Sequence, residues 1–239
     1  MIQKLITLAL APLLFLQGRR VQRTALVLPE AEGAREGVTG CGATFNLLVI
    51  GDSAAAGVGI ACQQQALIGR LVDELSQRHT VHWRLVAKTG RRLADVLRAV
   101  NSVSSGAVDL VVVSAGINDV LRGTSSKQWV ADLQALARLL RDRFHARAVA
   151  FSSIPRIQNF PLLPEPLAWY LGLRARELNH LTHQSMSALP ESWRVVDLDL
   201  PITAEFLARD GFHPNEAACV LWCRQVMAAL DLPSGDTLS

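Results

Sequence analysis

The stretch NLLVIGDSAAAGVG, residues 46–59, is an apolar run that stops on Gly51, Asp52 and Ser53 and then continues through alanines and glycines. A continuous apolar run of this length is typical of a β-strand that is covered on both faces. The serine at its end has three interpretations: a helix cap, part of a phosphate-binding loop, or a nucleophile. The pattern of the remaining chain separates them.

Short β-rich runs alternate with longer helical patterns along the chain, which predicts an α/β fold with a parallel sheet between helices. Apolar residues recur at the three- and four-residue spacing of one-sided helices in 67–75, 93–100 and 129–140. A last helix is expected over 214–230, with Pro214 in its first turn. The five candidate strands are 44–51, 81–88, 109–116, 146–154 and 193–198.

The composition is that of one globular domain without a nucleic-acid-binding face. Of 239 residues, 50% are apolar and 19% charged, which suffices for one sizeable core. Of the 24 basic and 21 acidic residues, five and three lie before Thr44, so the remainder carries 19 − 18 = +1. The four cysteines, at positions 41, 62, 219 and 223, are too irregularly spaced for a disulfide framework. Cys219 and Cys223 share an apolar helical stripe, which predicts that they pack in the core.

The first 18 residues are expected to form a separate segment. Residues 5–18 are uncharged and largely apolar, and this length suits the core of a signal peptide better than a membrane span. No small-residue cleavage pattern follows, and Arg19, Arg20 and Arg23 place more positive charge after the run than before it. This pattern favours a weakly membrane-associating segment and a cytoplasmic or cytoplasmic-face location, with periplasmic or secreted protein as the alternative.

Residues 19–43 mix charge with glycine and show no sustained periodicity, so we expect them to be mostly a linker. The ordered domain is expected to span residues 44–232, and residues 233–239 to form a C-terminal tail. Neither an internal repeat nor a low-complexity tract occurs in the sequence.

Four chemically distinctive elements are predicted to meet at one edge of the sheet. Ser53 follows the first expected strand, Gly90 the second and Asn118 the third. A fourth element, RDGFHPN at 209–215, lies between the last strand and the last helix. Because ligands bind outside the carboxyl ends of the strands in open parallel sheets, this edge is the candidate site.

The residue types at this edge match what an acyl-transfer site requires. A serine hydroxyl such as that of Ser53 needs a base within reach, and a carboxylate that fixes the tautomer of that base. His213 and Asp210 can supply both from one loop. The backbone N–H groups of Ser53 and Gly90 and the side-chain amide of Asn118 are candidate donors to a developing oxyanion.

These elements resemble the sequence blocks of the SGNH family of GDSL-type esterases and lipases. The first block matches GDS at 51–53, the second Gly90 in AKTG, the third GIND at 116–119, and the last DGFHP at 210–214. The resemblance implies a flavodoxin-like three-layer α/β/α sandwich with a five-stranded parallel sheet. It also implies a serine hydrolase that cleaves carboxylic esters through an acyl-enzyme and uses no metal or organic cofactor.

The resemblance further implies a role for each matching residue. Ser53 would be the nucleophile, His213 the general base and Asp210 its partner. Ser53, Gly90 and Asn118 would form the oxyanion hole.

The motif departs from the family pattern at Ala54, where the family name has leucine. This position carries no chemical group of the mechanism, so the departure bears on substrate or packing rather than on activity. Asp52 and Asp119 are expected to be structural and to hydrogen-bond the loops that hold Ser53 and Asn118.

Three other motifs bear on alternative chemistry. The glycines within residues 51–59 do not have the order of a dinucleotide-binding fingerprint, and no phosphate-loop lysine follows them. Glu177, His180 and His183 resemble a metal-ligand set but spread over about 120° of a helix, so we expect solvated helix surface. No serine has glycines two residues before and after it, so the elbow motif of α/β-hydrolases is missing.

The segment 155–173 is rich in proline and contains two aromatic residues, Trp169 and Tyr170. Its part from Phe160 onward can line or cover an acyl pocket, or pack the helix that follows. Lipid-like or short acyl esters are therefore favoured over sugar acetates and thioesters. The alternatives of another class are a non-catalytic ligand-binding module and a flavodoxin-like nucleotide or flavin binder.

Overall fold

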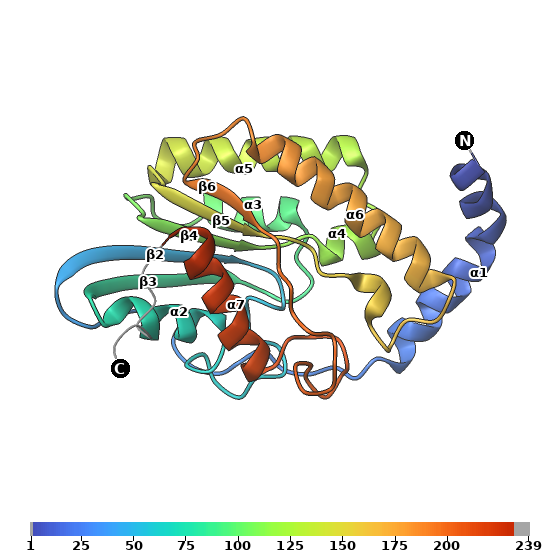
Figure 1. Ribbon diagram of the computed structural model, residues 1–239, viewed down its shortest axis with the longest axis horizontal. Coiled ribbons are helices and arrows are strands. Elements are labelled where there is room, and N and C mark those ends of the chain that lie inside the picture. Colours follow the sequence, from blue (N-terminus) through green and yellow to red (C-terminus); the bar gives the residue numbers. More distant parts are fainter. Residues whose placement is uncertain (1, 232–239) are drawn as a thin grey trace.

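A six-stranded sheet forms the middle layer of the molecule, in the order β1-β3-β2-β4-β5-β6 (Figure 1). The computed structural model describes the backbone of residues 2–231 and the side chains of residues 9–231, so the expected tail at 233–239 lies outside the described residues. Strands β2 to β6 pair in parallel, which confirms the five expected parallel strands, and β1 adds a sixth strand that was not expected. The strands are β1 (Glu36–Thr39), β2 (Ala43–Gly51), β3 (His79–Ala87), β4 (Leu110–Ser114), β5 (Ala148–Ser152) and β6 (Trp193–Val196).

The edge strand β1 lies in the segment that we expected to be mostly a linker, and it pairs antiparallel with β3. Gly37 lies opposite Trp83 in this pairing, and a Cβ at residue 37 would come within 2.8 Å of the indole ring. The glycine here therefore makes room for a large neighbouring side chain. Residues 36–39 are part of the sheet rather than of a linker.

Helices cover both faces of the sheet and give the three-layer α/β/α arrangement (Figure 1). One face carries α3 (Leu93–Asn101), α5 (Ser126–Phe144) and α6 (Leu167–Met186). The other face carries α2 (Leu67–Ser76) and α7 (Glu216–Ala229). Two short elements follow β4 and β5, namely α4 (Ile117–Leu121) and the 3-10 helix η1 (Ile157–Asn159).

Neighbouring residues of the central strands point into different layers of the core. Leu48 and Ile50 of β2 pack on the side of α3, α5 and α6, whereas Leu47 and Val49 pack on the side of α2 and α7. All five residues of β4 are buried. Because both faces of these strands are covered, they are apolar at nearly every buried position.

Helix α7 starts at Glu216, after a cap formed by Asn215. The Asn215 side chain accepts a hydrogen bond from the N–H of Ala218 at 3.1 Å. Pro214 precedes this cap, so the expectation that it lies in the first helical turn was wrong. Cys219 and Cys223 are buried in the core, as their apolar stripe predicted, and burial raises the pKa of both thiols to about 12.

The N-terminal helix α1 (Ile2–Thr24) continues past the expected end of the apolar segment. Its second half packs against the start of α6, where Leu14 is buried in the core. Gln17 accepts a hydrogen bond from the N–H of Leu167 at 3.1 Å and donates one to the Glu165 carbonyl at 2.7 Å. Across the described residues, no helix combines the length and apolar character needed to cross a membrane.

Candidate active site

Ser53, His213 and Asp210 form a continuous chain of polar contacts at the carboxyl edge of the sheet. Ser53 lies in the turn directly after β2, and its Oγ is 2.8 Å from Nε2 of His213. Nδ1 of the same imidazole is 2.6 Å from Oδ2 of Asp210. Ser53 and Asp210 are both buried, at 6% and 9% exposure. A hydroxyl, an imidazole and a carboxylate are thus aligned with little access to water.

The loop before α7 holds the carboxylate and the imidazole in a fixed relation. Oδ1 of Asp210 accepts hydrogen bonds from the N–H groups of Phe212 and His213, both at 3.0 Å. Gly211 has a φ of +66°, which favours glycine at this turn. Burial alone would raise the pKa of Asp210, but the hydrogen bonds from the His213 side chain and from the two backbone N–H groups hold it below its ordinary value. The carboxylate is therefore ionised at neutral pH.

The two other expected residues, Gly90 and Asn118, lie on adjoining loops. Gly90 follows β3 with a φ of +79°, a conformation that favours glycine. Asn118 lies in α4, and its Nδ2 donates a hydrogen bond to the Arg91 carbonyl at 3.0 Å. An amide nitrogen carries two hydrogens, so the second one is available for another acceptor.

Asp119 joins α4 to the start of α3. One carboxylate oxygen accepts from the N–H of Leu93 at 2.9 Å, and the other accepts from the Thr124 hydroxyl at 2.8 Å. This side chain therefore joins the segment that follows Gly90 to the segment that follows α4.

Asp52 lies directly before Ser53, and its carboxyl group is buried. It accepts a hydrogen bond from the N–H of Ala54 at 3.1 Å and lies 3.5 Å from the Ser114 hydroxyl. Burial is the largest influence on this group and raises its pKa to about 7.

A small apolar cavity of about 70 Å³ lies beside the site residues. Ala54, Ile117 and Phe212 line it, and each is a sequence neighbour of Ser53, Asn118 or His213. Of the segment 160–173, only Phe160 contributes to the lining. Phe160 also packs in the core of the α6 side, together with Leu167 and Leu171, which do not line the cavity.

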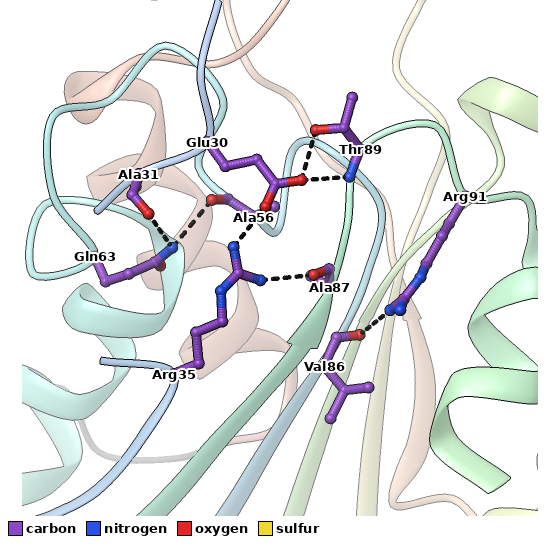
Figure 2. A network of polar contacts seen from close by, with 9 residues as sticks. All are labelled: Glu30, Ala31, Arg35, Ala56, Gln63, Val86, Ala87, Thr89 and Arg91. Atoms are coloured by element: carbon purple, nitrogen blue, oxygen red, sulfur yellow. Dashed lines mark hydrogen bonds and ion pairs between the residues drawn. The ribbon is translucent and has the colours of Figure 1, made fainter. Parts of the chain in front are cut away.

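No pattern in the sequence indicated the network of polar contacts around Glu30, which lies in the expected linker. Figure 2 shows its carboxylate between Thr89 and Arg35. Thr89 is the residue before Gly90. A segment remote in sequence therefore contacts one of the site loops.

The possible metal-ligand set on α6 does not converge. His183 pairs with Asp197 at 2.9 Å, whereas Glu177 pairs with Arg174. Within the part of the chain that the structure describes, no three His, Cys, Asp or Glu residues are placed to hold a metal ion.

A model of the GDSL-like lipase/acylhydrolase family matches residues 49–219. The chain belongs to this family. The match covers most of the chain and includes all five expected site residues, and it confirms the resemblance inferred from the four sequence blocks. The protein is therefore a carboxylic ester hydrolase, which decides against a nucleotide or flavin binder.

Solved structures of GDSL-type and related esterases share the fold at low identity. A psychrotrophic esterase from Pseudoalteromonas sp. is 19% identical, with a TM-score of 0.59 over 78% of this chain and 96% of its own. A lipase/acylhydrolase from Enterococcus faecalis is 20% identical, with a TM-score of 0.59 over 81% and 100%. An acetylxylan esterase from Geobacillus stearothermophilus is 17% identical, with a TM-score of 0.54 over 80% and 96%. A search among curated proteins finds no match.

Proposed function

We propose that the protein cleaves carboxylic esters in two steps through an acyl-enzyme on Ser53. The contact chain from Ser53 through His213 to Asp210 carries this proposal. In the first step His213 accepts the hydroxyl proton while Oγ of Ser53 attacks the carbonyl carbon, and it then gives the proton to the departing alcohol. In the second step His213 takes a proton from water, whose oxygen attacks the acyl carbon. The proton returns to Ser53 as the acid leaves.

The charge that develops on the carbonyl oxygen requires donors that are already in place. We assign the backbone N–H groups of Ser53 and Gly90 and the second N–H of the Asn118 amide to this role. Asp52 and Asp119 act as structural supports, because their carboxyl groups hold the neighbouring backbone. Asp210 stays ionised and orients His213 throughout.

The apolar cavity supports short or lipid-like acyl esters as substrates. Its lining includes Ala54, Ile117 and Phe212, so the chain of an acyl group bound to Oγ of Ser53 would lie next to apolar surface. Its small volume favours short chains. An acetyl ester of a carbohydrate is the second candidate, because an acetyl group fits the same cavity and one structural neighbour bears the name of an acetylxylan esterase.

The acyl-enzyme is tested by mixing the full chain with p-nitrophenyl esters of increasing acyl length and quenching in acid. The expected result is a mass increase equal to the acyl group on the peptide that contains Ser53, and none in Ser53→Ala. An adduct on any other residue would contradict the mechanism. Chain-length preference, compared with release of acetate from acetylated xylan, then separates the two substrate classes.

We also propose weak association of α1 with an anionic membrane surface. Arg19, Arg20 and Arg23 are exposed, and no acidic residue precedes Glu30 in the sequence. Cations beside apolar side chains suit the interface of a bilayer that contains anionic lipid. Five of the seven large apolar side chains that are exposed among residues 9–231 lie in or just after α1, namely Leu13, Phe15, Leu16, Leu26 and Val27.

Cosedimentation of the full chain with vesicles tests this association. Binding is expected to vesicles with phosphatidylglycerol, to weaken with salt, and to fall in the double variant Phe15→Ser/Leu16→Ser. Equal binding to pure phosphatidylcholine, or an unaffected variant, would contradict it.

A further inference from the structure

The chain between α1 and β1 contacts two of the loops that carry candidate site residues, the loop after β2 and the loop after β3. We name residues 29–35 the N-terminal arm. Its Ala31 N–H donates to the Ala56 carbonyl at 3.3 Å in the loop after β2. A Cβ at Gly57 would lie 2.8 Å from the Ala31 Cβ, so only a glycine lets the arm come this close. The small residues that follow Ser53 therefore form the surface on which the arm packs.

Glu30 connects the arm to the loop after β3. One of its carboxylate oxygens accepts from the backbone N–H of Thr89 at 2.6 Å and from the Thr89 hydroxyl at 2.7 Å (Figure 2). Burial alone would raise the pKa of Glu30, but these bonds and the Arg35 guanidinium lower it below its ordinary value. The group is an ionised acceptor at neutral pH.

Arg35 closes the network on the other side of the loop. Its Nη2 donates to the second Glu30 oxygen at 2.5 Å, and its Nη1 donates to the Ala87 carbonyl at 2.7 Å (Figure 2). Ala87 is the last residue of β3. The arm therefore holds the loop both where it leaves the strand and at Thr89, the residue before Gly90.

We propose that Glu30 is a positioning residue for ester hydrolysis, which orients the Gly90 N–H toward the oxyanion by holding Thr89. The inference rests on the proposed role of Gly90 as an oxyanion donor. Thr89 is exposed, so without Glu30 its N–H would bond to water and the loop would lose a fixed acceptor. The far side of the loop is already held by Asn118 through the Arg91 carbonyl.

The effect is expected on turnover rather than on stability. Glu30 and Arg35 are 26% and 38% exposed, and ion pairs at such sites stabilise a fold little. A displacement of about 1 Å in a catalytic group can cost about 10²-fold in rate. A fall in kcat without a loss of stability therefore distinguishes a positioning role of Glu30 from a merely structural one.

The test compares Glu30→Ala and Glu30→Gln in the full chain with the matched control Glu36→Ala. Glu36 belongs to the same N-terminal region and pairs with Arg84 of β3 at 3.0 Å, within the strand rather than at the loop. Glu30→Ala is expected to lower kcat for p-nitrophenyl butyrate by about 10- to 100-fold with little change in KM. Glu30→Gln should keep part of the activity because its amide oxygen still accepts, and Glu36→Ala should retain the wild-type kcat.

Amide hydrogen exchange gives a readout that does not depend on activity. Exchange in the peptide containing Thr89 and Gly90 should be faster in Glu30→Ala and unchanged in Glu36→Ala. If Glu30→Ala does not fold, Thr89→Ala removes one of the two bonds and should give a smaller fall in kcat. A wild-type kcat in the folded variants, or an equal loss in Glu36→Ala, would overturn the inference. Hydrolysis that persists in Ser53→Ala would instead overturn the proposed function.

Discussion

The side-chain amide of Asn118 is bonded to the backbone carbonyl of Arg91, the residue after Gly90, at 3.0 Å. The loops that supply two of the proposed oxyanion donors are thus joined to each other. Asp119, the next residue, accepts from the N–H of Leu93 and strengthens the same connection. These bonds therefore hold Gly90 and Asn118, which follow different strands, in a fixed position relative to each other.

Asn118→Ala should lower kcat by about 10²–10³, because it removes a donor to the oxyanion and also the bond to Arg91. Steady-state hydrolysis of p-nitrophenyl butyrate measures the loss. Asn118→Asp has the same size but a carboxylate in place of the amide, so it should not rescue the rate. Normal turnover in a folded Asn118→Ala protein would remove this residue from the site.

Asp210→Asn should lower kcat by about 10⁴, since the neutral amide no longer stabilises the imidazolium that forms on His213. KM should change little, because Asp210 is buried behind the imidazole. As a control, Asp197→Asn alters the other His–Asp pair, at His183 on the surface, and should leave turnover intact. Equal effects of the two substitutions would contradict the assignment.

Asp52 should make the wild type lose stability as pH rises. Its pKa is raised from 3.8 to about 7, chiefly by burial, so the folded state keeps a proton that the unfolded state has lost. Between pH 4 and 7 this group then lowers the free energy of unfolding by at most about 1.4 kcal/mol per pH unit. Asp52→Asn lacks this dependence, so in urea unfolding the free energy of unfolding of the variant relative to wild type should increase with pH. If the two free energies changed with pH in parallel, the raised pKa of Asp52 would be contradicted.

Ile202 lines the apolar cavity and provides a two-way test of acyl specificity. Ile202→Ala enlarges the cavity and should shift the preference in kcat/KM toward longer acyl chains. Ile202→Phe fills it and should shift the preference toward acetyl esters. Chain-length profiles that do not move in opposite directions would show that the acyl group binds elsewhere.

The parallel strands and the position of the candidate site residues at their ends could be predicted because both signals are local. Strand β4 is apolar at nearly every position because both of its faces are covered. Ser53, Gly90 and Asn118 each follow such a strand, and topology brings the ends together.

The N-terminal arm could not be predicted because its contacts are distant in sequence. Glu30 and Thr89 are 59 positions apart, and no periodicity marks either of them. Glycine and mixed charge around Gly37 indicate a linker, whereas in the structure this glycine lies in a strand and leaves room for the Trp83 side chain. The segment 160–173 shows a similar limit: Phe160 and Leu171 both pack in the core, and composition does not tell that only Phe160 of the two also lines the cavity.

The most direct test of the account is the rate of p-nitrophenyl butyrate hydrolysis by the folded Ser53→Ala variant beside wild type, both as full chains. Ser53 lies 2.8 Å from the base that would activate it, so removal of its hydroxyl should reduce hydrolysis to near the uncatalysed rate while the unfolding transition stays unchanged. Hydrolysis by Ser53→Ala at the wild-type rate would show that the nucleophile lies elsewhere.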